Sequence, residues 1–296
     1  MNNQLTTALS SFAPITLKEM SGIKLMNRID TKYITTEEHL MKLLEMLSKN
    51  YRVQVVNDES LIDYRTTYLD TPSLEMYMAH QTGRRVREKI RVRSYVSSRL
   101  TFLEVKNKDN HGRCDKKRIN VRDLKTLQED GAEEFLRSSS WYCLTELMPQ
   151  LRNTFSRITL VDNEKTERLT IDTDVNFLNL MNNDKKSLGR MVIIELKRDG
   201  RKMSYATRLF HEQNLRQASV SKYCVGMSMT NCELRQNRFK KLLMLVDKVN
   251  RAETDMSSFN TQRTFTPCPD IVPNSYSEKA MLNYYMAYNA TIQLSY

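Results

Sequence analysis

The feature that most constrains the fold is a set of short segments in which charged and apolar residues alternate. In Lys89–Arg93 the basic residues alternate with Ile90 and Val92. Successive side chains of a β-strand point to opposite faces of its sheet, so this pattern predicts a strand with one charged and one apolar face. The same pattern recurs in residues 102–108, 116–118, 168–172 and 193–197.

A single strand of this kind ordinarily turns its charged face to water. Five strands that share a face of mostly Lys, Arg and Glu favour a closed sheet, with the charged face inside and helices over the apolar face. Repulsion between enclosed like charges would make such an interior costly when empty, so we expect it to bind an anion. The predicted fold class is α+β, an antiparallel closed β-barrel surrounded by helices.

The positive charge of the chain is concentrated in one stretch. The 296 residues have a formal net charge of +11, and residues 84–118 hold thirteen Lys and Arg against four Asp and Glu. A focused positive field attracts a polyanion such as nucleic acid, an anionic membrane or a phosphate chain. A solvated basic surface is the alternative interpretation.

Periodicity and turn residues predict the remaining elements and the domain organisation. Residues 37–50 form an amphipathic helix behind Thr35 or Thr36 as the N-cap. Further helices are expected at 123–138, 205–217 and 232–251, with a polar loop at 182–188. The expected strands are 52–56, 63–69, 89–95, 100–108, 116–121, 154–161, 168–174 and 190–197. Residues 1–18 are predicted to be a loose lead-in, 19–250 one domain, and 251–296 a polar tail or packing arm.

Several classes of protein are disfavoured by what the sequence lacks. Five widely spaced cysteines without a C-x-x-C motif indicate neither a zinc site nor a disulfide framework. The N-terminus has no signal-peptide pattern, and no apolar run reaches the roughly 18 residues that span a bilayer. We therefore expect a cytoplasmic protein, and the sequence leaves open whether a membrane-protein partner holds it at a membrane.

The motifs on these strands resemble those of the polyphosphate polymerase domain of the vacuolar transporter chaperone (VTC) family, within the triphosphate tunnel metalloenzymes related to CYTH domains. The resemblance covers about residues 28–226. In order, the motifs are RIDTKY at 28–33, YLDTP at 68–72, YMAHQTG at 77–83, KIRVR at 89–93, FLEVK at 102–106, KKR at 116–118, SR at 156–157, RLTID at 168–172, IELK at 194–197 and SKY at 221–223. Each motif is short, and their shared order makes the resemblance specific.

The resemblance implies a basic tunnel that holds ATP, with Mn²⁺ or Mg²⁺ at the phosphates, and that passes the terminal phosphoryl group to inorganic polyphosphate. By position, the residues implied to contact phosphate are Lys32, Arg91, Arg93, Lys106, Lys116, Arg157, Arg168, Ser221 and Lys222, and Glu195 is the implied metal ligand. On the same charged faces, Lys197 joins the catalytic set, and Lys89, Lys108 and Arg118 join the substrate-binding set. Glu104 shares a face with Lys106 and is either a second metal ligand or the counter-ion of that lysine.

One departure from the related families bears on the reaction. The CYTH hydrolases carry a Glu-x-Glu-x-Lys signature that supplies paired metal carboxylates, whereas the equivalent stretch here begins with Arg28. This favours a polymerase over a hydrolase and weakens any two-metal proposal. A hydrolase of tripolyphosphate or a nucleoside triphosphate stays an alternative, as does a non-catalytic receptor for polyphosphate or RNA, although nucleic acid is not the expected partner. For His80, a structural hydrogen-bonding role is favoured over catalysis.

Overall fold

The structure is a computed structural model that describes residues 2–20, 28–200 and 203–251, without the side chains of residues 2, 28 and 199. Its strands are β1 (Ala13–Thr16), β2 (Arg28–Thr36), β3 (Tyr51–Val55), β4 (Leu61–Asp70), β5 (Arg87–Tyr95), β6 (Leu100–Lys108), β7 (Cys114–Asn120), β8 (Met148–Asp162), β9 (Glu167–Asn179), β10 (Lys185–Ser187) and β11 (Met191–Asp199). Its helices are α1 (Asn2–Leu9), α2 (Leu17–Met20), α3 (Glu37–Leu47), α4 (Glu75–Gln81), α5 (Ala132–Ser139), the 3₁₀ helix η1 (Leu144–Glu146), α6 (Tyr205–Glu212), α7 (Lys222–Thr230) and α8 (Lys240–Arg251). In this part of the chain no helix is both long and apolar enough to cross a bilayer.

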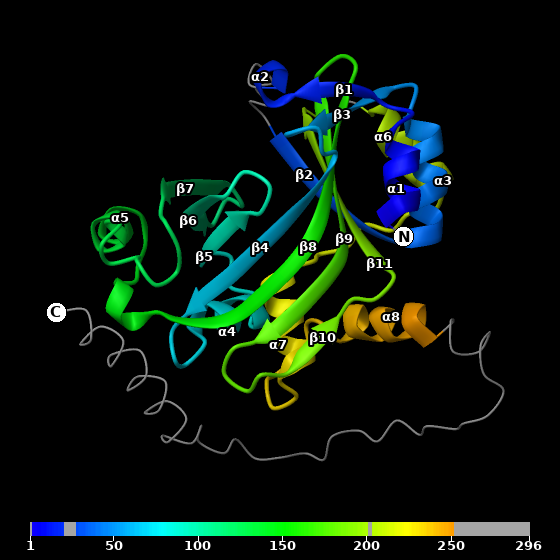
Figure 1. The fold of residues 1–296 in the computed structure, drawn as a ribbon. Coiled ribbons are helices and arrows are strands. Elements are labelled where there is room, and N and C mark those ends of the chain that lie inside the picture. Colours follow the sequence, from blue (N-terminus) through cyan, green and yellow to red (C-terminus); the bar gives the residue numbers. More distant parts are fainter. Residues whose placement is uncertain (1, 21–27, 201–202, 252–296) are drawn as a thin grey trace.

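All of these strands belong to one strongly curved sheet (Figure 1). The main path runs in the order β2-β11-β9-β8-β4-β5-β6-β7, and every neighbouring pair on it is antiparallel. Three short strands extend it, since β10 pairs with β9, β3 pairs with β8, and β1 runs parallel to β3. The predicted α+β class with a mainly antiparallel sheet is confirmed.

The predicted closed barrel is wrong in one respect, because the sheet does not close through hydrogen bonds. Among the described residues, the end strands β2 and β7 are not paired with each other. The outer edge of β2 is partly taken by the segment before α7: the Ala218 N–H donates to the Lys32 carbonyl at 2.9 Å, and Tyr33 forms an isolated bridge with Gln217. That segment therefore occupies hydrogen-bonding groups that barrel closure would have used.

Helices cover the apolar face of the sheet in two groups. On one side α1, α3 and α6 pack against β2, β3, β8, β9 and β11, with fully buried Leu40, Leu44 and Phe210 (Figure 1). On the other side α4, α5, α7 and α8 join the core formed by β4, β5 and β6, where Ile90 and Leu103 are fully buried. The apolar positions of the alternating segments thus lie under helices, as the sequence predicted.

Local hydrogen bonds explain where helices were predicted correctly and where they were not. The Thr36 hydroxyl accepts the His39 N–H at the start of α3, so the predicted cap is confirmed. The helix predicted at 123–138 is wrong for its first half: the Asp123 carboxylate accepts the N–H groups of Lys125 and Thr126, and α5 begins only after Gly131. Side chains that bond nearby backbone groups compete with helix formation in this way.

Four other predicted boundaries also change. The helix predicted at 205–217 ends at Glu212, because the residues that follow turn back to pair with β2. Residues 232–239 form turns, in which the Asn231 side chain accepts the Glu233 N–H, so α8 begins only at residue 240. The loop predicted at 182–188 contains the short strand β10. The predicted loose lead-in contains α1 and β1, and Leu5 and Leu9 are buried against α3.

The division of the chain into domains stays a prediction. Residues 252–296, which make up almost all of the predicted tail, lie outside the described residues.

Candidate functional site

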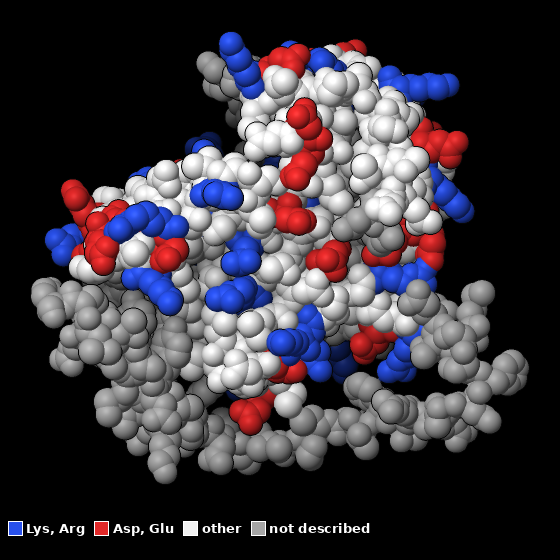
Figure 2. Space-filling view, viewed as in Figure 1, with Lys and Arg blue, Asp and Glu red and all other residues white. Residues whose placement is uncertain are grey.

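Most charged positions of the alternating segments lie on the inner, concave face of the sheet. Cross-strand pairs establish this: Lys32 lies opposite Glu195, Arg157 opposite Asp172, and Arg91 opposite Glu104. Figure 2 shows Lys and Arg side chains running down the middle of the molecule with a few acidic groups between them. We call this inner face the basic face.

The first cluster on the basic face is built around the Glu104 carboxylate, which is 1% exposed. Both Nε and a terminal nitrogen of Arg91 lie 2.7 Å from its Oε2, and Lys116 forms an ion pair with Oε1. Burial alone would raise the pKa of Glu104, but the neighbouring cations outweigh it and lower the pKa to about 2. Burial also lowers the pKa of Lys116 to about 8, despite the nearby carboxylate. Glu104 is therefore an ionised counter-ion inside the sheet.

The second cluster joins strands β8 and β9 to helix α7. Arg157 holds both oxygens of Asp172, with Nε 2.6 Å from Oδ1 and a terminal nitrogen 2.8 Å from Oδ2. The Lys222 ammonium, at the first residue of α7, also donates to Asp172 and lies 4.0 Å from the centre of the Phe155 ring. Burial lowers the pKa of Lys222 to about 7, and repulsion from Arg157 adds to this, while Asp172 opposes it. This buried triad fixes the start of α7 against the sheet.

The third cluster lies on β11 and its neighbours. The Lys197 Nζ is 2.7 Å from Glu195 Oε2, and the Thr170 hydroxyl is 3.5 Å from the same oxygen. Burial alone would raise the pKa of Glu195, but Lys197 and Lys32 outweigh it and hold the pKa well below its usual range. Burial lowers the pKa of Lys197 to about 8. Both contacts described for the Glu195 carboxylate use Oε2. Oε1 is therefore the oxygen that could bind a metal ion.

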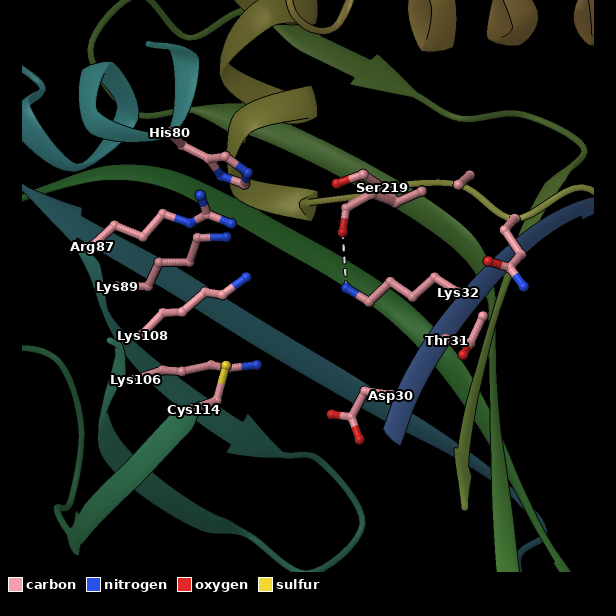
Figure 3. Close-up of a pocket in the computed structure, with 13 residues that line it drawn as sticks. Asp30, Thr31, Lys32, His80, Arg87, Lys89, Lys106, Lys108, Cys114 and Ser219 are labelled. Atoms are coloured by element: carbon pink, nitrogen blue, oxygen red, sulfur yellow. Dashed lines mark hydrogen bonds between the residues drawn. The ribbon is translucent and has the colours of Figure 1, made fainter. Parts of the chain in front are cut away.

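A cavity of about 490 Å³ opens between β2 on one side and β5, β6 and β7 on the other. We call it the tunnel cavity; Figure 3 shows that Lys32, Arg87, Lys89, Lys106 and Lys108 point into it. The Lys32 ammonium donates to the Val220 carbonyl at 2.8 Å, and Lys89 donates to the Ser221 hydroxyl at 2.9 Å. These two bonds tie opposite walls of the cavity to the segment that leads into α7.

The combination of fold, motif order and basic face agrees with one family. The sequence matches the VTC domain over residues 27–231. The chain belongs to the VTC domain family. This family has the fold of the triphosphate tunnel metalloenzymes, also called CYTH-like.

Comparisons with other proteins add structures of low similarity to this VTC domain. A Hippeastrum protein for which a dominant triphosphatase activity is described shares 15% identity, with a TM-score of 0.43, over 69% of this chain and 97% of that one. A Pyrococcus horikoshii protein shares 11% identity, with a TM-score of 0.42, over 68% and 98% of the two chains. A Pyrococcus furiosus protein shares 12% identity, with a TM-score of 0.39, over 67% and 99%. No curated protein matches the sequence.

The VTC domain brings most of the residues predicted from its sequence onto the basic face. Arg91, Arg93 and Lys116 surround Glu104, and Arg157 and Lys222 share Asp172. Arg168 lies opposite Lys197 across β9 and β11. Arg118 is exposed at the edge of the sheet, where its guanidinium lies 4.4 Å from the centre of the Phe102 ring. The catalytic and binding roles of all these residues stay predictions.

Glu104 and Glu195 differ in how well they suit a metal ion. Both oxygens of Glu104 contact cations, which are Arg91, Arg93 and Lys116. Lys106, the counter-ion considered for Glu104 in the sequence, is not among these contacts. In the described part of the chain, no group of three or more His, Cys, Asp or Glu could hold a metal ion. Mg²⁺ usually binds through one or two carboxylates together with substrate phosphates and water. Glu195, with one available oxygen, fits that kind of site better than Glu104.

Two residues that the sequence did not assign to the site are also part of it. Asp172 is the counter-ion of Arg157 and Lys222, and its alternation with Arg168 and Thr170 was a signal that could have identified it. His80 lines the tunnel cavity, and its Nδ1 lies 2.9 Å from the buried Cys224 thiol. Burial lowers the pKa of His80 to about 2, and the nearby cations Lys89 and Arg87 add to this. His80 is thus a neutral group in the cavity wall, and no sequence pattern marks its contact with Cys224.

Proposed function

We propose that this VTC domain transfers the terminal phosphoryl group of ATP to a growing polyphosphate chain on the basic face, with Mn²⁺ or Mg²⁺ at the phosphates. The observation that carries the proposal is the excess of cations around the tunnel cavity. The buried carboxylates Glu104, Asp172 and Glu195 already have cationic partners. Five Lys and Arg side chains point into the cavity, whereas Asp30 is the carboxylate that lines it among the described residues. Lys106 and Lys108 have no carboxylate partner among the contacts described. A polyanion is the ligand that such a surface would stabilise.

The proposed reaction needs no covalent intermediate on the protein. A terminal oxygen of polyphosphate attacks the γ-phosphorus of ATP, the bond from that phosphorus to the bridging oxygen breaks, and ADP leaves. The attacking oxygen is already ionised at neutral pH, so no general base has to remove a proton. Positioning and charge stabilisation supply most of the rate in phosphoryl transfer.

Different residues of the basic face would supply the positioning and the charge stabilisation. Arg91 and Arg157 present guanidinium groups that suit non-bridging phosphate oxygens, and both are already held in place by buried carboxylates. Lys32, Lys89 and Lys106 add mobile point charges from two walls of the tunnel cavity. A divalent ion held by Glu195 would neutralise charge on the phosphate oxygens during transfer.

The test combines product analysis with two glutamate variants. The purified protein is incubated with ATP and Mn²⁺ or Mg²⁺, and its products are resolved on a polyphosphate-staining gel. The proposal predicts long chains together with ADP. Glu195→Gln should lower kcat by roughly 100-fold or more, because it removes the charged metal ligand. Glu164→Gln, an exposed glutamate in the turn between β8 and β9, is the matched control and should behave as wild type.

Each other outcome leads to a different function. Free phosphate without chains would replace the polymerase by a hydrolase, in which water is the acceptor. Retained polyphosphate binding without loss of ATP would leave a non-catalytic receptor. Full activity of Glu195→Gln, with chains still formed, would remove Glu195 as the metal ligand but keep the polymerase.

A further inference from the structure

A second cavity, of about 690 Å³, lies on the opposite side of the start of β5 from the tunnel cavity. It is formed by α4, by the segment that leads into β5, and by the two residues Trp141 and Tyr142 after α5. We call it the outer cavity. Its volume lies within the range of small-molecule sites, about 300–1,000 Å³. Its lining contains none of the residues of the three charged clusters on the basic face.

The outer cavity offers a flat aromatic surface. Trp141 is 58% exposed although it is a large apolar side chain, and Met78 and Val86 line the same cavity. An exposed indole ring provides a face on which a planar ring can stack. The surface of the cavity is thus suited to a ligand with a planar, largely apolar part.

Arginines connect this surface to the tunnel cavity. Arg87 lines both cavities, and its side chain points into the tunnel cavity in Figure 3. Its guanidinium donates to the Arg84 carbonyl at 2.9 Å, which fixes it at the boundary between the two. Arg84 and Arg85 are exposed and line the outer cavity. Arg87 would therefore favour a ligand that extends from one cavity to the other and is negatively charged where it passes this guanidinium.

A buried carboxylate adds a polar contact in the outer cavity. Glu88 is 2% exposed and lines the cavity. The Ser140 hydroxyl donates to its Oε1, and the Trp141 N–H and the Asn107 side chain also interact with this carboxylate. No described group makes a well-aligned hydrogen bond to its Oε2. Burial raises the pKa of Glu88. An acceptor oxygen of this kind, beside an aromatic face, suits the N–H groups of a nucleobase or a ribose hydroxyl.

We propose that the outer cavity binds the nucleoside part of the triphosphate, with the base on Trp141 and the phosphates passing Arg87 into the tunnel cavity. This inference rests on the proposed function, because it assumes that the phosphates occupy the basic face. An aromatic face, an acceptor oxygen for N–H groups and the arginines of the outer cavity suit a nucleotide better than a peptide or a polyphosphate chain alone.

The single tryptophan of the chain makes the proposal directly measurable. The emission of Trp141 is followed while the full chain is titrated with ATP or with tripolyphosphate, each to saturation as judged by calorimetry. ATP should change the emission, and tripolyphosphate should leave it unchanged at equal occupancy. The proposal is overturned by an unchanged emission at saturating ATP, or by equal changes with the two ligands.

Variants separate the base contact from the phosphate contacts. Trp141→Ala should raise the KM for ATP about fivefold or more with little change in kcat, because it removes a stacking surface. Trp141→Phe, which keeps an aromatic ring, should have a smaller effect, and tripolyphosphate affinity should be unchanged in both variants. Arg84→Ala should weaken ATP binding, whereas Arg137→Ala, an exposed arginine on α5 outside both cavities, should not. Equal weakening of ATP and tripolyphosphate by Trp141→Ala would contradict the proposal.

Failure of this inference and failure of the proposed function give different results. If polyphosphate is made normally while Trp141→Ala keeps the wild-type KM, the polymerase stands and the nucleoside site is wrong. If no polyphosphate is made but the emission of Trp141 responds to ATP alone, the nucleoside site stands and the polymerase is wrong.

Discussion

Replacing Asp172 by asparagine would test whether the buried cations of the basic face depend on a counter-ion. Asp172 is 3% exposed and contacts Arg157 through two hydrogen bonds and Lys222 through a third. Asparagine has nearly the same shape, so the substitution removes charge without leaving a cavity. It leaves two cations in the interior without their carboxylate.

The two cations should respond differently to this loss. Burial and Arg157 lower the pKa of Lys222 to about 7, although Asp172 opposes this lowering. Without the Asp172 carboxylate the pKa should fall further, so Lys222 should lose its proton at neutral pH in the variant. Arg157 cannot lose its proton and has to stay charged. Removing one partner of a buried ion pair costs about 3–5 kcal/mol of unfolding free energy. For a domain of this size, that corresponds to a fall of roughly 6–20 °C in Tm.

A bound polyanion should compensate for the missing carboxylate. We therefore expect tripolyphosphate to raise the Tm of Asp172→Asn by more than it raises the Tm of the wild type. Thermal unfolding with and without tripolyphosphate measures both quantities. Asp174→Asn is the matched control: Asp174 lies two residues further along the same strand and is exposed, so its replacement should change the free energy of unfolding by less than about 0.5 kcal/mol.

Two results would refute this reasoning. A variant as stable as the wild type would show that Asp172 is not needed to hold the buried cations. A smaller ligand-induced rise in Tm than in the wild type would show that the bound anion does not lie near Arg157.

Two further predictions concern the lysines of the basic face and the packing of helix α7. Burial lowers the pKa of Lys222 to about 7 and of Lys89 to about 8, and an anion bound beside them should raise both. Tripolyphosphate affinity should therefore fall as the pH rises from 7 to 9, with net proton uptake on binding at pH 8. Calorimetry in two buffers of different ionisation enthalpy measures this uptake, and its absence would contradict the prediction. Gly226→Ala would place a Cβ 2.5 Å from a Leu151 methyl group and 2.6 Å from the Phe177 ring. It should cost about 1–3 kcal/mol in urea unfolding and lower activity by shifting α7, whereas wild-type stability would show that the core can adjust.

The alternation of residue types was sufficient to predict most of the sheet and the inward direction of its charge. Because side chains of a strand alternate between its two faces, Glu195 and Lys197 must share one face of their strand, independently of the rest of the fold. The same holds for Arg91 and Arg93. These predictions depend only on local strand geometry, which is why they agree with the structure.

What the sequence did not reveal depends on contacts between distant segments. Helix α7 was not predicted because almost all of its residues are buried, so it lacks the apolar periodicity of a surface helix. The contact between His80 and Cys224 joins residues 144 positions apart. The open edge of the sheet depends on Gln217 and Ala218, which turn back to pair with β2. No local pattern encodes such an approach.

The position of β7 at the end of the sheet affects how the protein behaves towards other copies of itself. Among the described strands, β7 pairs only with β6, so its other edge presents backbone groups that could join a strand of another molecule. Exposed lysines on an edge strand oppose such pairing, and β7 carries Lys116, Lys117 and Arg118. The charge expected to attract phosphate therefore also keeps this edge from aggregating. A substitution that neutralises β7 would lower solubility as well as phosphate binding, and loss of activity in such a variant would need to be separated from self-association.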